Sequence, residues 1–228
     1  MIDWAWIADH AAPIAGRVAQ HVELTVIALA VGFVLAFGLA LWSVRRPGVK
    51  ALVIGVTGVL FTIPSLAMFA AFTSITGLSL LTAEIPLVLY TLVIYVRNMV
   101  VGLESVPADV LEAADAAGYT PRQRLFRVEL PLAVPLIVAG LRLASVSTIG
   151  LVTITSTIGD AFGGLGFFIR ERPFFATEVL VGALGSIALA IAADLAFGRV
   201  QRRLTPWAAE PRQHIDPGRP AMGEAGAT

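Results

Sequence analysis

Long runs of hydrophobic residues alternate with short polar stretches along this chain. A helix that rises 1.5 Å per residue needs about 20 apolar residues to cross a bilayer core of about 30 Å. Five runs reach this length, at about residues 23–44, 51–73, 85–103, 133–156 and 179–198. Hydrocarbon offers no hydrogen-bond partners to exposed backbone groups, so each run is predicted to be a helix. The pattern therefore predicts an all-α polytopic membrane protein with about five transmembrane helices.

The second run contains a proline in its interior, Pro64 in the sequence FTIPSLA. Proline has no backbone N–H, so it removes one helical hydrogen bond and bends the span. One interpretation is that Pro64 and Ser65 form a bend that lines a translocation path or a gate. The alternative is a kink that only fits the helix to its neighbours.

Composition supports a membrane protein and excludes several other classes. The chain is 57% hydrophobic and only 14% charged, whereas a soluble domain is about a quarter charged. No basic stripe is present, so no nucleic-acid partner is expected. There is no cysteine, and the three histidines lie outside the apolar runs with no ligand spacing. The sequence therefore predicts neither a metal site nor a catalytic residue.

The distribution of basic residues predicts the orientation, because cytoplasmic loops carry an excess of Lys and Arg. With the N-terminus outside, 11 basic residues fall on the inner side and 3 on the outer side. The inner ones are Arg45, Arg46, Lys50, Arg122, Arg124, Arg127, Arg199, Arg202, Arg203, Arg212 and Arg219; the outer ones are Arg17, Arg170 and Arg172. The C-terminus is therefore expected in the cytoplasm.

The runs also predict the domain organisation. The first ten residues lack the basic region of a signal peptide, so the first run is expected to be retained. Residues 1–21 form an extracytoplasmic segment in this interpretation, and 22–204 form the transmembrane domain. Residues 205–228 are rich in proline, glycine and alanine with no apolar period, which predicts a disordered cytoplasmic tail.

Residues 105–131 lie between the third and fourth runs and are predicted to form two short cytoplasmic helices. Ser105 and the proline that follows favour the start of a helix, and Gly118 favours its end, because glycine adopts the left-handed conformation. Thr120, with a proline after it and a glutamine three positions on, favours a second helix start. That second helix is predicted to stop near Leu130-Pro131.

The first of these helices carries alanines on its apolar face, Ala113, Ala114 and Ala117. Such a face is too shallow to bury much area against lipid, but small residues let another surface approach the backbone closely. We interpret the segment as a docking element for a separate cytoplasmic protein. The alternative is a loop helix packed beneath its own bundle.

A recognisable motif covers this segment. Glu112-Ala113-Ala114, then Gly118, then Val128-Glu129-Leu130-Pro131 resemble the signature EAA-x3-G-x9-I-x-L-P of the permease subunits of ABC importers. The one departure is valine where isoleucine is commonest. The resemblance implies a type I importer fold in which a coupling helix seats in a cytoplasmic ABC ATPase dimer. The implied coupling residues are Glu112, Ala113, Ala114, Gly118, Leu130 and Pro131.

The chain has no nucleotide-binding loop of its own. A P-loop needs the pattern G-x4-G-K-[ST], and the only lysine, Lys50, stands in PGVKAL. We therefore expect a transport subunit with no cofactor, and a separate ATPase that binds ATP and Mg²⁺.

Four further stretches resemble permeases for quaternary-ammonium osmoprotectants such as glycine betaine, carnitine, choline and proline betaine. They are FTIPSLAMFAAF, YVRNMVVGLESVP, IGDAFGGLGFFI and ADLAFGRVQRRLTP. The resemblance covers about residues 20–205. It implies a multi-pass protein of the bacterial plasma membrane, surrounded by lipid, that works with a second permease subunit, identical or homologous. It also implies a separate extracytoplasmic solute-binding protein, whose aromatic cage holds the trimethylammonium group.

Two alternatives remain for the function. Asp160-Ala161-Phe162 departs from the small residues usual in this family, so another small solute such as an amino acid is one alternative. A secondary transporter is the other. It would need acidic or polar coupling groups at mid-membrane, and the spans offer few.

Three charged residues fall inside predicted spans: Arg97, Arg142 and Asp194. A charge in a span is costly and normally faces a partner or water. We hypothesise that Asp194 pairs with Arg97 or Arg142 near the inner mouth and holds the bundle together. The alternative is that the arginines extend to the inner interface. Since the expected solute carries a fixed positive charge, the arginines are not expected to bind it.

Overall fold

A computed structural model describes residues 2–206 of the chain, and this part contains only helices and connecting turns. The α-helices are α1 (Trp4–Asp9), α2 (Ala11–Val44), α3 (Pro47–Thr62), α4 (Ser65–Thr76), α5 (Leu80–Glu104), α6 (Ala108–Ala116), α7 (Pro121–Arg124), α8 (Leu130–Thr155), α9 (Gly166–Glu171) and α10 (Ala176–Leu204). A π-helix, η1 (Leu125–Glu129), and a 3₁₀-helix, η2 (Asp160–Phe162), complete them. The all-α prediction is confirmed, and the predicted tail lies outside the described residues from 207 onward.

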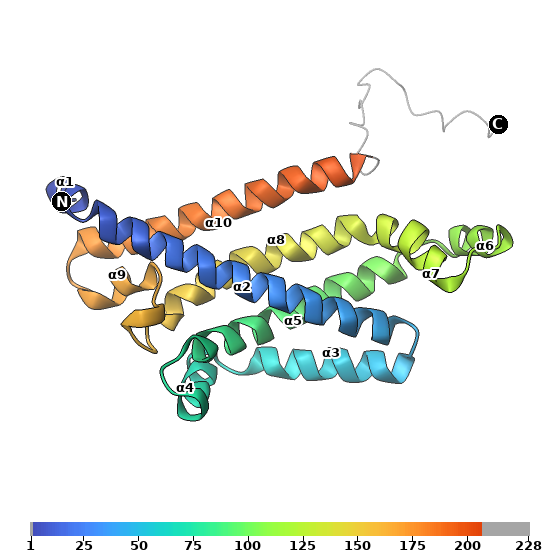
Figure 1. Cartoon of the computed structure of the whole chain (residues 1–228), viewed down its shortest axis with the longest axis horizontal. Helices are drawn as coiled ribbons and strands as arrows, with labels where there is room; N and C mark the ends of the chain where they lie inside the picture. The colour runs from blue at the N-terminus through green and yellow to red at the C-terminus, as the bar shows by residue number, and fades with distance from the viewer. Residues whose placement is uncertain (1, 207–228) are drawn as a thin grey trace, which may run out of the picture.

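Four long helices, α2, α5, α8 and α10, run along the length of the molecule (Figure 1). Each is long and apolar enough to cross a membrane, and the pair α3 and α4 adds a fifth crossing if it counts as one span. α5 is the most buried of the four because α2, α3, α4 and α8 all pack against it. α10 is the least buried and packs on α8 and α9.

The core around α5 depends on small residues that let the helices approach closely. A methyl group added to Gly32 of α2 would lie 1.9 Å from the Thr91 hydroxyl oxygen, so only glycine fits there. Tyr95 and Met99 are fully buried in the same cluster, against Ala36 on α2. Small residues on α2 therefore let α5 approach closely and make room for its large side chains.

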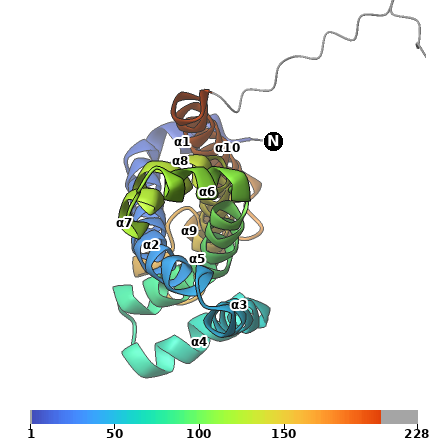
Figure 2. The same cartoon turned by 90° about the vertical axis from the view of Figure 1, so that its right-hand side faces the viewer.

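The second predicted span is broken rather than bent. α3 ends at Thr62 and α4 begins at Ser65, and their axes differ by 95°; the expectation of one kinked helix is wrong. Ile63 is extended, with φ −68° and ψ 127°, as a residue before proline prefers. The Tyr90 hydroxyl of α5 donates to the Ile63 carbonyl, so the break leaves that acceptor paired. Figure 2 shows α3 nearly end-on below the bundle, with α4 running across the view beside its end.

The segment between α5 and α8 also differs from its prediction in two places. Ser105 ends α5 rather than starting α6, and its hydroxyl donates to the Gly102 carbonyl. The second helix does not stop at Leu130-Pro131, because α7, η1 and α8 form one continuous helix. The Leu130 N–H reaches back five residues to the Leu125 carbonyl. This wide π turn accommodates Pro131, which has no N–H to donate.

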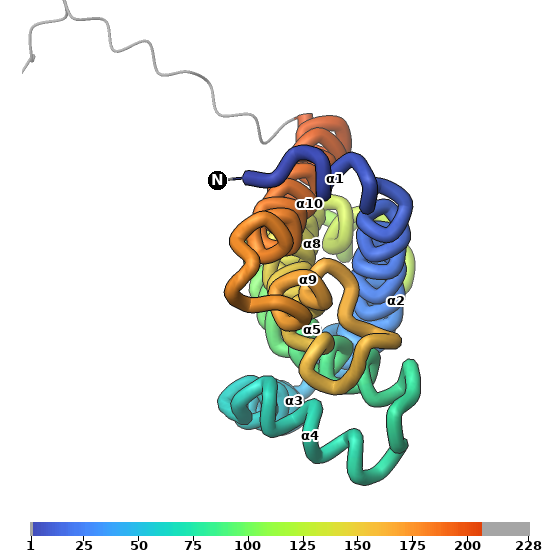
Figure 3. The backbone as a smooth tube through the Cα atoms, turned by 90° about the vertical axis from the view of Figure 1, so that its left-hand side faces the viewer, coloured from blue at the N-terminus to red at the C-terminus, as the bar shows by residue number. Residues whose placement is uncertain are grey.

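The two ends of the bundle carry different elements. One end holds α1, η2 and α9, as Figure 3 shows from that side. The other end holds the turn between α2 and α3, the helices α6 and α7, and the end of α10 (Figure 1). Arg17, Arg170 and Arg172 belong to the first end. Of the basic residues predicted inside, those within residues 2–206 belong to the second. The side of the membrane that each end faces stays a prediction.

Candidate functional site: the α6 surface and the charged groups of the bundle

Helix α6 lies at the end of the bundle, beyond the long helices (Figure 1). Glu112, Ala113 and Gly118 are exposed on it, whereas Ala114 is buried against α7 and η1. Gly118 has φ +81°. Its N–H donates to the Asp115 carbonyl, and the next N–H donates to the Ala114 carbonyl at 3.1 Å. This is a Schellman motif, which explains why a glycine stands four residues after the second alanine.

The other two residues of the predicted coupling set lie elsewhere. Leu130 and Pro131 are half-buried at the start of α8, next to the π turn. They shape the connection between α7 and α8 and do not share the exposed surface of α6. Two aromatic residues are exposed near that surface: Tyr119, which follows Gly118, and Phe126 on η1, with an exposed fraction of 61%.

A network of charged side chains ties α6 to the long helices. Arg124 contacts the Asp115 carboxylate at 2.5 Å and the Glu129 carboxylate at 2.9 Å. Arg45, just after α2, lies 3.5 Å from the same Glu129 oxygen. The Glu129 side chain is only 8% exposed. Arg124 and the end of α2 thus meet at one buried carboxylate on η1, and Arg124 connects α6 to it.

Sequence reasoning missed the pair Arg124 and Glu129, and the π-helix explains why. Residues five apart point about 140° away from each other on an ordinary α-helix, at 3.6 residues per turn. Only a turn that joins residues i and i+5 brings such a pair to one side. The available signal was an acidic residue at the start of an apolar run, immediately before Leu130-Pro131.

Two of the three intramembrane charges lie together. Arg142 of α8 donates to both carboxylate oxygens of Asp194 on α10, at 2.8 and 2.9 Å, and to Gln201 at 3.2 Å. That the pair holds the bundle together stays a prediction.

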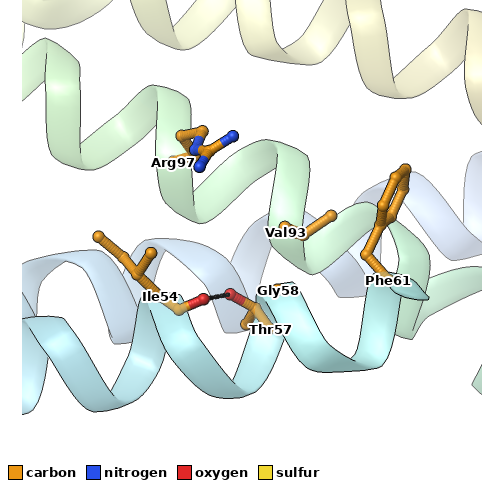
Figure 4. A pocket seen from close by; sticks show the side chains of 6 residues that line it. All are labelled: Ile54, Thr57, Gly58, Phe61, Val93 and Arg97. Atoms are coloured by element: carbon orange, nitrogen blue, oxygen red, sulfur yellow. Dashed lines mark hydrogen bonds between the residues drawn. The ribbon is translucent and has the colours of Figure 1, made fainter. Parts of the chain in front are cut away.

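Arg97 lies apart from this pair. It is exposed on α5 and lines a cavity of about 250 Å³ between α3 and α5 (Figure 4). The other lining residues are Val93 of α5 and Ile54, Thr57, Gly58 and Phe61 of α3. No carboxylate within residues 2–206 forms an ion pair with Arg97.

The break between α3 and α4 lies next to this cavity. Pro64 is exposed and Ser65 is half-buried, three and four residues beyond Phe61. The Phe61 ring packs edge-on against the Tyr90 ring, with centroids 5.9 Å apart. The break and Arg97 thus belong to the α3–α5 interface, whereas Arg142 and Asp194 join α8 to α10.

His21 is a structural residue that the sequence did not single out. It is fully buried on α2, which begins at Ala11, earlier than the predicted span. The Leu165 N–H donates to Nδ1 of His21 at 3.2 Å, and Nε2 lies 3.0 Å from the Ile149 carbonyl. Because Nδ1 accepts, Nε2 carries the proton and donates to Ile149. The neutral imidazole thus fixes the connection after α8 to α2.

The departure at Asp160-Ala161-Phe162 is held by the same end of α2. Arg17 donates to the Asp160 carbonyl, and Arg170 pairs with the Asp160 carboxylate. Gln20 donates to the Ala161 carbonyl. Asp160 therefore has a structural role at this end of the bundle. Across residues 2–206, no cluster of three His, Asp or Glu could hold a metal ion.

Known proteins resemble this chain in sequence and in structure. The choline transport system permease protein OpuBB of Bacillus subtilis (strain 168) is 33% identical over 189 residues, which cover 82% of this chain and 86% of that protein. The carnitine transport permease protein OpuCB of Listeria monocytogenes is 36% identical over 192 residues, with coverage of 82% and 86%. An inward-facing structure of the MetNI methionine ABC transporter matches the fold with a TM-score of 0.76 and 22% identity, covering 84% of this chain and 96% of that one.

A family model also matches most of the chain, over residues 24–206. The match includes the spans, α6 and the continuous helix from α7 to α8. The predicted ABC importer permease fold is therefore confirmed. The chain belongs to the family of binding-protein-dependent transport system inner membrane components, the multi-pass permease subunits of ABC importers.

Proposed function

We propose that this permease subunit takes up a small quaternary-ammonium osmoprotectant, of the choline, carnitine or glycine betaine type. The observation that carries the proposal is the similarity to a choline permease and a carnitine permease over more than four fifths of each chain. The resemblance of four sequence stretches to osmoprotectant permeases supports the same solute class. In this family the permease is a transport subunit, and a separate ATPase binds the nucleotide.

The proposed assembly contains a second permease subunit, a cytoplasmic ABC ATPase dimer and an extracytoplasmic solute-binding protein. The exposed surface of α6 is the proposed contact with the ATPase, and its small residues support close docking. The N-terminus is then outside and the C-terminus inside, as the basic residues indicate. α1, η2 and α9 face the solute-binding protein in this arrangement.

The charged network gives the proposed route from the ATPase to the spans. When ATP binding closes the ATPase dimer, α6 moves with the groove that holds it. Arg124 joins α6 to Glu129, which lies at the start of α8 and next to Arg45. Movement of α6 therefore acts on both α8 and α2. The bundle then opens outward to accept solute, and hydrolysis returns it to the inward state.

Uptake by the reconstituted importer tests this function. The permease is co-expressed with its proposed ATPase and binding protein, purified, and placed in liposomes with ATP inside. Radiolabelled choline, carnitine, glycine betaine and methionine are offered in parallel, each with saturating binding protein. We expect ATP-dependent uptake of at least one quaternary-ammonium solute and none of methionine. Uptake of methionine alone, or uptake that an ion gradient drives without ATP, would contradict the proposal.

A further inference from the structure

The cavity between α3 and α5 combines a positive charge with an aromatic ring. Arg97 and Val93 stand four residues apart on α5, and Ile54, Thr57 and Phe61 repeat at helical spacing on α3 (Figure 4). One face of each helix therefore lines the cavity. Its volume of about 250 Å³ is several times the roughly 30 Å³ that a water molecule takes up in the liquid. A solute with a few carbon atoms fits in this space.

Arg97 is an intramembrane charge that the described part of the chain does not neutralise. Arg142 satisfies its own charge with Asp194 through two hydrogen bonds, but Arg97 has no acidic partner within residues 2–206. A charge inside a span normally faces a partner or a water-filled path. The Thr57 hydroxyl donates to the Val53 carbonyl of its own helix at 2.8 Å. The guanidinium group is thus the charged donor of the cavity.

Phe61 supplies the second chemical feature. The face of an aromatic ring attracts a quaternary ammonium group through its quadrupole. Phe61 is half exposed at the end of α3, and its ring rests edge-on against Tyr90. Tyr90 is itself fixed, because its hydroxyl donates to the Ile63 carbonyl at the break. The Phe61 ring at the cavity is therefore held in place by its contact with Tyr90.

We propose that this cavity is a solute site on the translocation path for zwitterionic betaines. Arg97 binds the carboxylate of the solute through charge-assisted hydrogen bonds, and Phe61 contacts its trimethylammonium group. The inference rests on the proposed function. The expectation that the arginines do not bind solute considered only the fixed positive charge. Carnitine and glycine betaine also carry a carboxylate, whereas choline does not, so the site distinguishes the two kinds of solute.

The test compares a zwitterion with a cation in the same reconstituted importer. Initial uptake rates are measured with saturating binding protein loaded with glycine betaine or carnitine, and then with choline. Arg97→Gln removes the charge and keeps hydrogen-bonding atoms. We expect betaine or carnitine uptake to fall about tenfold or more, the effect of losing a charged hydrogen bond, and choline uptake to change by less than about twofold. Arg97→Lys should retain part of the zwitterion uptake.

Phe61 and a matched arginine complete the design. Phe61→Leu should lower uptake of both kinds of solute, because both carry the trimethylammonium group, and Phe61→Tyr should retain it. Arg46→Gln removes an exposed charge at the N-cap of α3, away from the cavity, and should leave both rates unchanged. Co-purification of all subunits is checked for each variant.

Each other result overturns the site. An equal loss of uptake for both kinds of solute would mean that Arg97 stabilises the fold. Loss of subunit co-purification would mean that Arg97 forms an ion pair with a neighbouring subunit. Unchanged uptake of both assigns it to the membrane interface. If the unmodified importer takes up no quaternary-ammonium solute while its ATPase is active, the proposed function itself is wrong.

Discussion

Two buried tyrosines on α5 give a sharp test of how the broken span is stabilised. The Tyr90 hydroxyl donates to the Ile63 carbonyl at the break. The Tyr95 hydroxyl is fully buried and has no hydrogen-bond partner in the described part of the chain. Each ring packs edge-on against one phenylalanine, Phe61 or Phe33. Replacement of either tyrosine by phenylalanine removes one oxygen and keeps the ring contact.

The two replacements should have opposite effects on the free energy of unfolding. Tyr90→Phe leaves the Ile63 carbonyl without its donor, and an unpaired buried acceptor costs about 1–3 kcal/mol. Ile63 is 38% exposed, so we expect about 1–2 kcal/mol of destabilisation, the lower part of that range. Tyr95→Phe removes a hydroxyl that is buried without a partner, which is itself unfavourable. Its expected effect is between zero and about 1 kcal/mol of stabilisation.

Reversible unfolding in mixed detergent micelles, titrated with sodium dodecyl sulfate, measures both variants against the unmodified permease. Melting temperatures of the complete importer give the second measurement. The double variant should show the sum of the single effects, because the two hydroxyl groups share no partner. If Tyr95→Phe destabilises the protein as much as Tyr90→Phe, the hydrogen bond to Ile63 does not stabilise the break and the reasoning is refuted.

Three further predictions follow from the α6 network and the ion pair of the bundle. Arg124→Ala should destabilise the permease by about 3 kcal/mol, because it leaves the buried Glu129 without its close partner. Glu129→Ala should cost only about 2 kcal/mol, since Arg124 keeps its contact with Asp115. Equal costs in the same titration would contradict this asymmetry, and variants of the exposed pair Lys50 and Glu104 serve as the control. Gly118→Asp should abolish co-purification of the ATPase without affecting membrane insertion, and Gly118→Ala should cost about 1–2 kcal/mol in backbone strain at φ +81°. Gly16→Asp, at the opposite end of the bundle, controls for the added charge. A Gly118→Asp complex that survives purification would argue against docking at α6. Asp194→Asn should lower both the melting temperature and uptake because Arg142 loses its counter-charge, and unchanged assembly and uptake would count against the proposed role of the pair.

The long helices were predictable because lipid requires about 20 apolar residues per span and leaves no alternative to the helix. The start of α2 was not, since its first three turns carry Arg17, Gln20 and His21. These polar residues find partners more than 120 positions away, at Ile149 and in residues 160–165. No window of local sequence contains that information.

The break in the second span shows the same limit. Pro64 indicates a bend but not its size. Tyr90, 27 residues further along the chain, donates to the Ile63 carbonyl at the break, where the two helix axes differ by 95°. Likewise, the sequence left open whether Asp194 pairs with Arg97 or Arg142, because only the packing of α10 on α8 decides between them.

The candidate coupling surface was predictable in part. The Schellman motif at Gly118 could be anticipated from the glycine itself, and Ala113 and Gly118 are exposed as a docking surface requires. Leu130 and Pro131 were assigned to the same contact from the motif alone, and the structure places them at the start of α8. A sequence motif groups residues by their spacing alone, but the structure places Leu130 and Pro131 apart from the motif residues of α6.

The π turn at Leu125–Glu129 lets the continuous helix hold one additional residue. A π turn places one residue more than an α turn within nearly the same rotation, so α6 keeps the direction that a helix one residue shorter would give it. A residue lost from the regular part of the same helix would instead swing α6 by about 100° around the helix axis. The position of a deletion along this helix, and not only its length, thus decides whether α6 turns.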